Sequence, residues 1–272
     1  MKHILTALLC LMTLASCEKP ISLDSASDDK KTVKQDGNLI VAVANAGLPT
    51  TRLNFVVFDM NGSRVKQVNQ TSGMADLGVA AFQLEPGTYQ LVVVAHSSDG
   101  NPTLANIRKV QYTNAQGFTD TFLATGSVTI DDVQTTKSVS LQRISSLCRF
   151  MLHDDIPANV KKMRFYYTGG SGAFDATTGL GCVKSKQSVL FDVADGQKQF
   201  DLYTFLHAAS GTISLLVTAY DANDNVLQER TYEVPLQQNH ITYCDCPYFS
   251  GDSMASSITL FDGWEGEYHL GF

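Results

Sequence analysis

The sequence predicts an all-β protein with two tandem β-sandwich domains. After Gly37, short runs rich in β-branched and aromatic residues alternate with Gly, Asn, Pro and Asp. No long stretch repeats its apolar residues with the 3.6-residue period of an amphipathic helix. The runs form two series of sandwich size, without the strand–helix alternation of an α/β enzyme. A boundary near Gln142 gives an N-terminal sandwich over 38–142 and a C-terminal sandwich over 143–272.

The first series consists of short apolar runs that end in turn-forming residues. Its predicted strands are Leu39–Ala46, Leu53–Asp59, Val79–Leu84, Tyr89–His96, Phe122–Ile130 and Lys137–Ile144.

The strand Tyr89–His96, which follows the Pro86-Gly87 turn, is the clearest of this series. Side chains alternate between the two faces of a strand, and both sets are apolar here. One face carries Tyr89, Leu91, Val93 and Ala95, and the other carries Val92 and Val94. This pattern predicts a central strand that is covered on both sides.

The second series begins just after the boundary. Its strands are expected at Leu147–His153, Lys162–Thr168, Ser188–Val193, Phe200–His207, Thr212–Asp221, Val226–Val234 and His240–Tyr248. The segment Asp221–Asn225 is the expected hairpin turn between two of them.

Residues 1–16 are predicted to be an export signal. Lys2 and His3 precede the apolar stretch Ile4–Leu14, which is short of the roughly 20 residues that span a bilayer. The stretch ends in Leu14-Ala15-Ser16-Cys17, which resembles the lipobox of bacterial lipoproteins. The resemblance implies cleavage before Cys17 and acylation of its thiol, with a covalent lipid as membrane anchor. An ordinary secretory signal with a chance cysteine is the alternative.

Residues 17–37 are polar and charged, which predicts a flexible tether of roughly 24 Å as a random coil. The signal holds one charged residue, Lys2, so residues 17–272 carry a formal net charge of −8. This negative charge argues against a nucleic-acid partner. No later segment is apolar for long enough to cross a membrane as a helix.

Four cysteines remain once Cys10 leaves with the signal and Cys17 carries lipid. In an oxidising compartment they allow three disulfide connectivities, and buried free thiols are the alternative. We expect the thiols of Cys244 and Cys246 on opposite faces of a strand, with a spacing that does not fit a zinc knuckle. The four are Cys148, Cys182, Cys244 and Cys246.

The sequence carries no complete catalytic or metal-binding signature. Gly251-Asp252-Ser253 resembles the start of an esterase motif but has no downstream Asp-x-x-His. Asp221, Asn223 and Asn225 alternate as in a calcium loop, yet Val226 stands where such a loop needs glycine. We therefore expect no enzyme activity, no metal site and no cofactor.

Several stretches resemble the fimbrillin superfamily, the subunits of type V pili, and most closely its FimB-type lipid-anchored subunits. They occur in the family's order between about residues 39 and 248. They are Arg52–Asp59 with Gly62 and Asn69-Gln70, Pro86–Tyr89 with Val92–His96, Thr119–Phe122, Leu141–Ile144, Ile156–Val160 and Phe165–Thr168.

This resemblance implies two transthyretin-like sandwiches and a structural role at the outer membrane and cell surface, with other pilin subunits as partners. In the family an arginine-specific protease removes the first strand of stalk subunits, and a strand of the next subunit fills the groove. Anchor subunits keep the lipidated N-terminus.

Arg52 is the candidate protease site. No arginine precedes it, which suits an anchor, but it follows the predicted first strand, where a stalk or tip subunit would be cut. The sequence is compatible with both readings. A third reading is a surface lipoprotein that binds glycan through exposed aromatic side chains, although Trp264 is the one tryptophan of the chain.

The C-terminus is a candidate donor strand for a neighbouring pilin. Apolar residues recur there with period two, and polar residues fall between them. The apolar set is Ile258, Leu260, Trp264, Tyr268, Leu270 and Phe272. The alternative is a last strand that folds onto the sheet of its own domain, above all before Gly263.

Overall fold

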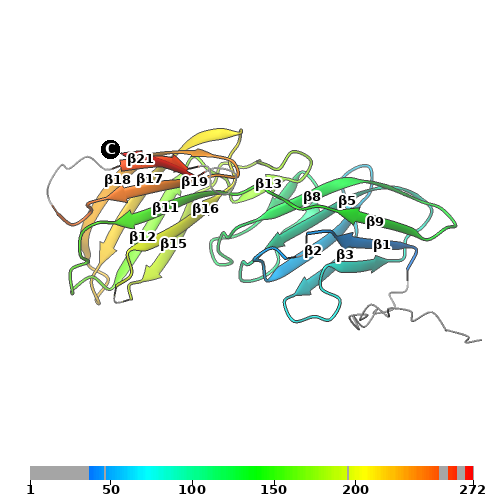
Figure 1. Ribbon diagram of the computed structural model, residues 1–272, viewed down its shortest axis with the longest axis horizontal. Coiled ribbons are helices and arrows are strands. Elements are labelled where there is room, and N and C mark those ends of the chain that lie inside the picture. Colours follow the sequence, from blue (N-terminus) through cyan, green and yellow to red (C-terminus); the bar gives the residue numbers. More distant parts are fainter. Residues whose placement is uncertain (1–36, 46, 195, 251–256, 262–266, 272) are drawn as a thin grey trace, which may run out of the picture. The chain divides into compact units, whose positions relative to one another are not determined.

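The computed structural model describes residues 37–45, 47–194, 196–250, 257–261 and 267–271 (Figure 1). All regular elements in these residues are strands, which confirms the predicted all-β class. The first ten are β1 (Leu39–Val43), β2 (Arg52–Phe58), β3 (Arg64–Thr71), β4 (Val79–Phe82), β5 (Gly87–His96), β6 (Thr103–Asn106), β7 (Lys109–Gln111), β8 (Phe122–Ile130), β9 (Thr135–Val139) and β10 (Gln142–Arg143). The rest are β11 (Ser146–Leu152), β12 (Lys162–Thr168), β13 (Ala173–Asp175), β14 (Leu180–Gly181), β15 (Gln187–Asp192), β16 (Gln199–Thr204), β17 (Ser210–Tyr220), β18 (Val226–Gln237), β19 (Ile241–Cys246), β20 (Ser257–Phe261) and β21 (Glu267–Gly271).

Two sheets form a sandwich in the N-terminal half. The smaller sheet has the strand order β4-β1-β9, and the larger has the order β10-β8-β5-β2-β3. The apolar side chains between them include Leu39 and Val41 of β1, Phe55 of β2, and Leu91 and Val93 of β5, all of which are buried. Burial of side chains of this size contributes roughly 1.5 to 3 kcal/mol each.

The central strand β5 is covered on both faces, as its sequence predicts. Leu91, Val93 and Ala95 lie in the core of the N-terminal sandwich. Val92 and Val94 point the other way and are buried in a second cluster with residues of β6, β7 and β13.

The C-terminal half forms a second sandwich. Its sheets have the orders β16-β11-β19-β20-β21 and β15-β12-β17-β18. Aromatic rings dominate the core between them, and Phe150, Phe165 and Phe200 lie in edge-on or tilted contact with centroids 5.0 to 5.3 Å apart. Such ring pairs add roughly 0.5 to 1.5 kcal/mol to the area they bury.

A small sheet joins the two halves. Its order is β14-β13-β7-β6, and β13 pairs with β7 through Ala173 with Gln111 and Phe174 with Val110. Phe174 is buried in the same cluster as Val92 and Val94. Residues Gln35–Phe272 accordingly form one compact unit, and the domain boundary near Gln142 stays a prediction.

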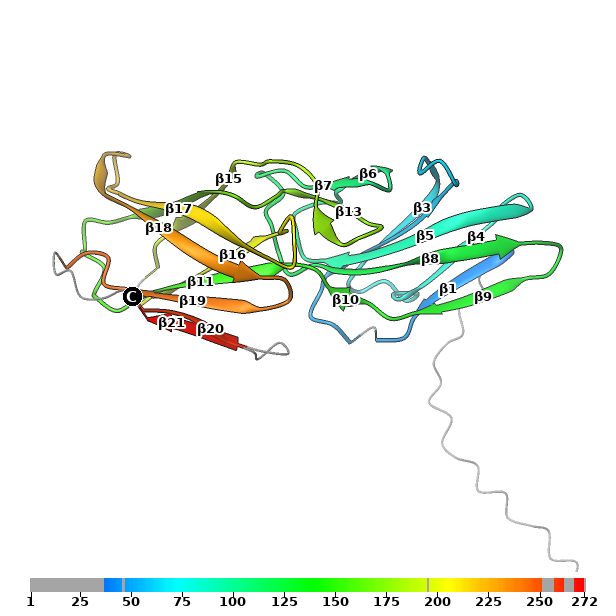
Figure 2. The same ribbon diagram turned by 90° about the horizontal axis from the view of Figure 1, so that it is seen from above.

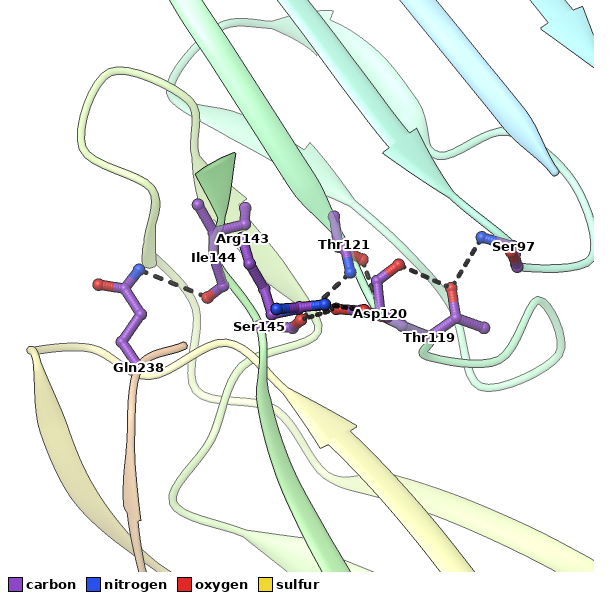
Figure 3. Close-up of polar contacts among 8 residues, drawn as sticks. All are labelled: Ser97, Thr119, Asp120, Thr121, Arg143, Ile144, Ser145 and Gln238. Atoms are coloured by element: carbon purple, nitrogen blue, oxygen red, sulfur yellow. Dashed lines mark hydrogen bonds and ion pairs between the residues drawn. The ribbon is translucent and has the colours of Figure 1, made fainter. Parts of the chain in front are cut away.

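The chain passes from β10 to β11 through a hydrogen-bonded link (Figure 3). Arg143 donates two hydrogen bonds to the carboxylate of Asp120, with N–O distances of 2.8 and 2.9 Å. The Ser145 hydroxyl also donates to Asp120 at 2.9 Å and accepts the backbone N–H of Thr121 at 3.1 Å. This half-buried pair is bidentate, a geometry that holds both side chains in one arrangement.

Two sequence expectations differ from the structure. The predicted strand Lys137–Ile144 is two strands in different sheets, because the chain leaves β9 and crosses to β10. The strands β3, β6, β7, β13 and β14 were not predicted. They are short or, like β3, mostly exposed at a sheet edge, so they lack an apolar alternation.

Candidate functional site

The first strand, β1, is the middle strand of the smaller N-terminal sheet. It pairs antiparallel with β4 over four residues and parallel with β9 over five. Leu39, Val41 and Val43 point into the core and are buried. Removal of β1 would leave both neighbours unpaired and open an apolar groove between them.

Two asparagines fasten the ends of β1. The Asn38 side chain donates to the carbonyl of Leu84 at 2.7 Å and accepts the N–H of Leu84 at 2.9 Å. Asn45 makes the same pair of bonds with Leu141, at 3.0 and 2.9 Å. Each asparagine thus replaces one rung of a strand ladder beyond the end of the sheet. The sequence signal was only an asparagine on each side of an apolar run.

The candidate cleavage residue Arg52 is the first residue of β2, not part of the preceding loop. Its backbone lies opposite Thr71 of β3 and His96 of β5. The Arg52 guanidinium donates through Nε to the carbonyl of Ser98 at 3.0 Å. The peptide bond after Arg52 therefore lies inside a five-stranded sheet, with neighbours on both sides.

A buried polar network lies beside Arg52. The backbone N–H of Ser98 donates to Nδ1 of His96 at 3.2 Å, so the proton of the neutral ring is assigned to Nε2. Nε2 then donates to Asn54 Oδ1 at 2.9 Å, and the Asn54 amide donates to Asn69 and Asn101. Burial, and next the nearby charge of Arg52, lowers the pKa of His96 to about 4.

A second cluster fixes the point where the C-terminal segment leaves the sandwich. The Asp154 carboxylate accepts the backbone N–H groups of Tyr248 at 3.1 Å, Phe249, and Ser250 at 2.6 Å. Arg230 donates to the carbonyl of Ser250 at 3.1 Å. Hydrogen bonds to a charged group are the stronger kind, so the chain is well held up to Ser250.

The two terminal strands lie at the outer edge of β19. Its residues Cys244 and Asp245 pair with β20, and Ile241–Tyr243 pair with β21. On its other side β19 pairs with β11 over six residues. Of the candidate donor residues, Ile258 and Leu260 lie in β20, and Tyr268 and Leu270 lie in β21. Trp264 and Phe272 lie outside the described residues, as does Cys17.

The four cysteines in the described part of the chain are free thiols. Cys182 is exposed, whereas Cys148, Cys244 and Cys246 are buried in the C-terminal core. The expectation for Cys244 and Cys246 is wrong, because residues two apart project from the same face of a strand. Their sulfur atoms are 3.3 Å apart. This contact and then burial raise the pKa of Cys244, so its thiol stays protonated at neutral pH.

The segment Asp221–Asn225 is a hairpin turn. The Asp221 carboxylate accepts the backbone N–H groups of Asn223 and Asn225 at 2.8 and 2.9 Å, together with the Asn225 amide. Among the described residues, no group of three His, Cys, Asp or Glu side chains is placed to hold a metal ion. The same residues include no helix that is long and apolar enough to cross a bilayer.

The described residues thus form paired all-β sheets with a fastened first strand and a terminal hairpin bound at one sheet edge. The chain belongs to the family described as Fimbrillin-A associated anchor proteins Mfa1 and Mfa2, which matches residues 34–256. A pilus-associated function follows, at the cell surface and in association with other fimbrial subunits. The resemblance to the fimbrillin superfamily is confirmed.

Several solved structures are similar to this chain. A candidate adhesin of Bacteroides ovatus aligns at 15% identity over 76% of this chain and 85% of its own, with a TM-score of 0.50. A fimbrial assembly protein of Parabacteroides distasonis aligns at 14% identity over 86% and 97%, with a TM-score of 0.43. The tip fimbrial protein Mfa3 of Porphyromonas gingivalis aligns at 12% identity over 86% and 99%, with a TM-score of 0.42. A comparison with curated proteins gives no match.

Proposed function

We propose that this protein is a lipid-anchored pilus subunit at the outer membrane, and that it keeps its first strand. The lipid would be attached to Cys17, and residues 17–37 would link it to the folded body. Family membership supports the pilus role, and the lipobox-like sequence supports the anchor.

The backbone pairing of Arg52 within its sheet is the observation that favours an anchor over a cleaved stalk or tip subunit. A protease that reads an extended substrate needs free backbone groups on either side of the bond it cuts. Around Arg52 those groups face β3 and β5. The asparagine clamps at Asn38 and Asn45 add four hydrogen bonds that hold β1 in its groove. A subunit that retains β1 has no groove for an incoming strand at that place.

The terminal hairpin is the proposed link to the neighbouring pilin. Five residue pairs hold it to β19, two through β20 and three through β21. The Asp154 cluster fixes the chain before the hairpin. Release of the hairpin from β19 would therefore leave the sandwich core in place. The free segment would then add to the groove of a neighbour, with Trp264, Tyr268, Leu270 and Phe272 in its pockets.

Truncation after Gly263 tests this link. Each pocket residue contributes roughly 1.5 to 3 kcal/mol, so the truncated protein should fold normally but no longer co-purify with pilus subunits. Circular dichroism and thermal unfolding check the fold, and pull-down from a detergent extract of whole cells checks the association. Wild-type recovery of the pilus, or an unfolded truncated protein, would refute the donor role. Cys17→Ala serves as a control, because it should detach the protein from the membrane without altering its association with pilus subunits.

A further inference from the structure

The strand β8 has an unpaired edge. On one side it pairs with β5 over nine residues, Phe122–Ile130, without a register shift. On the other side it pairs with β10 only through Phe122 and Leu123. No other strand in the described part of the chain covers the stretch from Ala124 to Ile130 on that side. This open stretch is about 20 Å long at the rise of a strand.

The edge carries none of the features that usually block pairing. Natural edge strands are guarded by charged side chains, prolines or bulges. The segment Ala124–Ile130 has no charged residue and no proline, and its ladder with β5 is regular. Its outward side chains, Thr125, Ser127 and Thr129, are exposed and small enough to flank a further strand.

A groove of about 420 Å³ lies beside the first part of this edge, up to Gly126. One wall is β8 from Leu123 to Gly126, and another is the chain from Lys137 to Gln142, which includes the free side of β9. Figure 2 shows β8 and β9 as consecutive strands joined by one loop. The turn Ala176–Gly179 closes the groove. The turn is held by Asp175, whose carbonyl accepts the N–H of Gly179 at 2.8 Å and whose carboxylate accepts the N–H of Thr177 at 2.8 Å.

The lining of the groove indicates the kind of chain that fits. It is rich in hydroxyl groups, and of the described residues that line it only Lys137 is charged. The glycine at position 126 leaves open space, since a Cβ built there meets no atom within 4 Å. An occupant thus finds backbone partners along β8, room over Gly126, and one positive charge.

We propose that the β8 edge is an acceptor for an extended segment of another polypeptide, which adds to the larger N-terminal sheet along the line of β10. The segment is mostly uncharged and carries a carboxylate opposite Lys137. Main-chain hydrogen bonds provide the affinity, and the Lys137 contact sets the register. This site is separate from the β1 groove and from the terminal hairpin, and it does not depend on either.

A peptide probe tests the proposal with the full-length protein. The probe is a fluorescent peptide of about ten residues, alternating threonine and valine with one central aspartate, at a concentration where it stays monomeric. Fluorescence anisotropy measures binding, and amide hydrogen exchange locates it. We expect protection of the amides between Thr125 and Ile130. A version with N-methyl groups at alternate residues should not bind, because it cannot donate the ladder hydrogen bonds.

Matched variants separate this site from others. Gly126→Lys places a charge in the groove without a clash and should weaken binding by about tenfold or more. Gly47→Lys is its control, because a Cβ at Gly47 also meets no atom within 4 Å. Lys137→Glu should weaken binding of the aspartate peptide and strengthen binding of a version with lysine in its place. Lys66→Glu on β3 should change the binding of neither peptide.

Three results would overturn the proposal. They are equal binding by Gly126→Lys and Gly47→Lys, protection at a different strand, and absence of binding by the wild type. Concentration-dependent protection of β8 without peptide would also overturn it, because the occupant would then be a second copy of this chain. None of these outcomes bears on pilus association, which the truncation after Gly263 tests.

Discussion

His96 shows how a single buried side chain makes the stability of this fold depend on pH. The ring is fully buried, and both of its nitrogens are used, one by Asn54 and one by the backbone of Ser98. A protonated ring would lose the bond from Ser98, because both nitrogens would then be donors. The folded protein therefore holds His96 neutral, with a pKa of about 4 against 6.5 for the free side chain.

The direction of the pH effect follows from proton binding. Between pH 6.5 and 4 the unfolded chain binds a proton at His96 that the folded chain does not bind. The neutral His96 ring makes its full contribution to the free energy of unfolding above about pH 6.5. This contribution is lost as the pH falls towards 4, and the complete loss amounts to about 3 kcal/mol. Urea unfolding of the wild type and of His96→Gln at pH 7.5 and 4.5 measures it. The variant should show the smaller loss, and parallel losses in the two proteins would contradict the assignment.

At the residue scale, the sequence showed where polar side chains stand but not which of them meet. Asn54 and His96 are 42 residues apart, and Asp154 is 94 residues from Tyr248. Only the strand pairing brings these groups together. The same holds for the thiols of Cys148 and Cys244, which lie on neighbouring strands of one sheet.

The strand β1 is the element on which the proposed anchor role depends. Asn38→Ala together with Asn45→Ala removes all four end bonds while leaving the buried side chains of β1 in place. At roughly 1 kcal/mol for each net hydrogen bond, we expect a loss of about 2 to 4 kcal/mol and faster opening of the strand.

Limited proteolysis with an arginine-specific protease measures how fast β1 opens. In the wild type, cleavage at Arg108, whose side chain is 76% exposed, should precede cleavage at Arg52. The double variant should be cut at Arg52 markedly faster, with cleavage at Arg108 unchanged. Equal rates at Arg52 in both proteins would show that the clamps do not protect it.

At the element scale, the apolar strands were predictable and the polar ones were not. Phe122–Ile130 and Lys162–Thr168 have the same bounds in the prediction and in the structure. The strand β3 was not predicted, because five of its eight residues are exposed and its sequence shows no alternation of apolar and polar residues. The pairing of β13 with β7 could not be predicted, because three residues on each strand carry too little pattern to define a register.

The whole molecule is held together by the sheet that both halves share. Phe174 of β13 is fully buried, and its ring lies 4.9 Å from that of Phe205. It packs in the cluster that also covers the outer side of β5. Phe174→Ala should therefore destabilise both halves, by about 3 to 5 kcal/mol, and not the C-terminal half alone.

Hydrogen exchange followed by mass spectrometry distinguishes the two cases. Faster exchange is expected in β5 as well as in β12, with Leu190→Ala as a control, since Leu190 is 56% exposed. Faster exchange confined to residues after Gln142 would support two independent domains at the predicted boundary.

The central claim is that the chain keeps its lipidated N-terminus and its first strand as part of a pilus. Mass spectrometry of the protein from the bacterial membrane fraction tests it most directly. The account predicts a mature chain that begins at an acylated Cys17 and continues through Arg52 into the body. A chain that begins at Leu53 would contradict it, because the first strand would then have been removed as in a stalk or tip subunit.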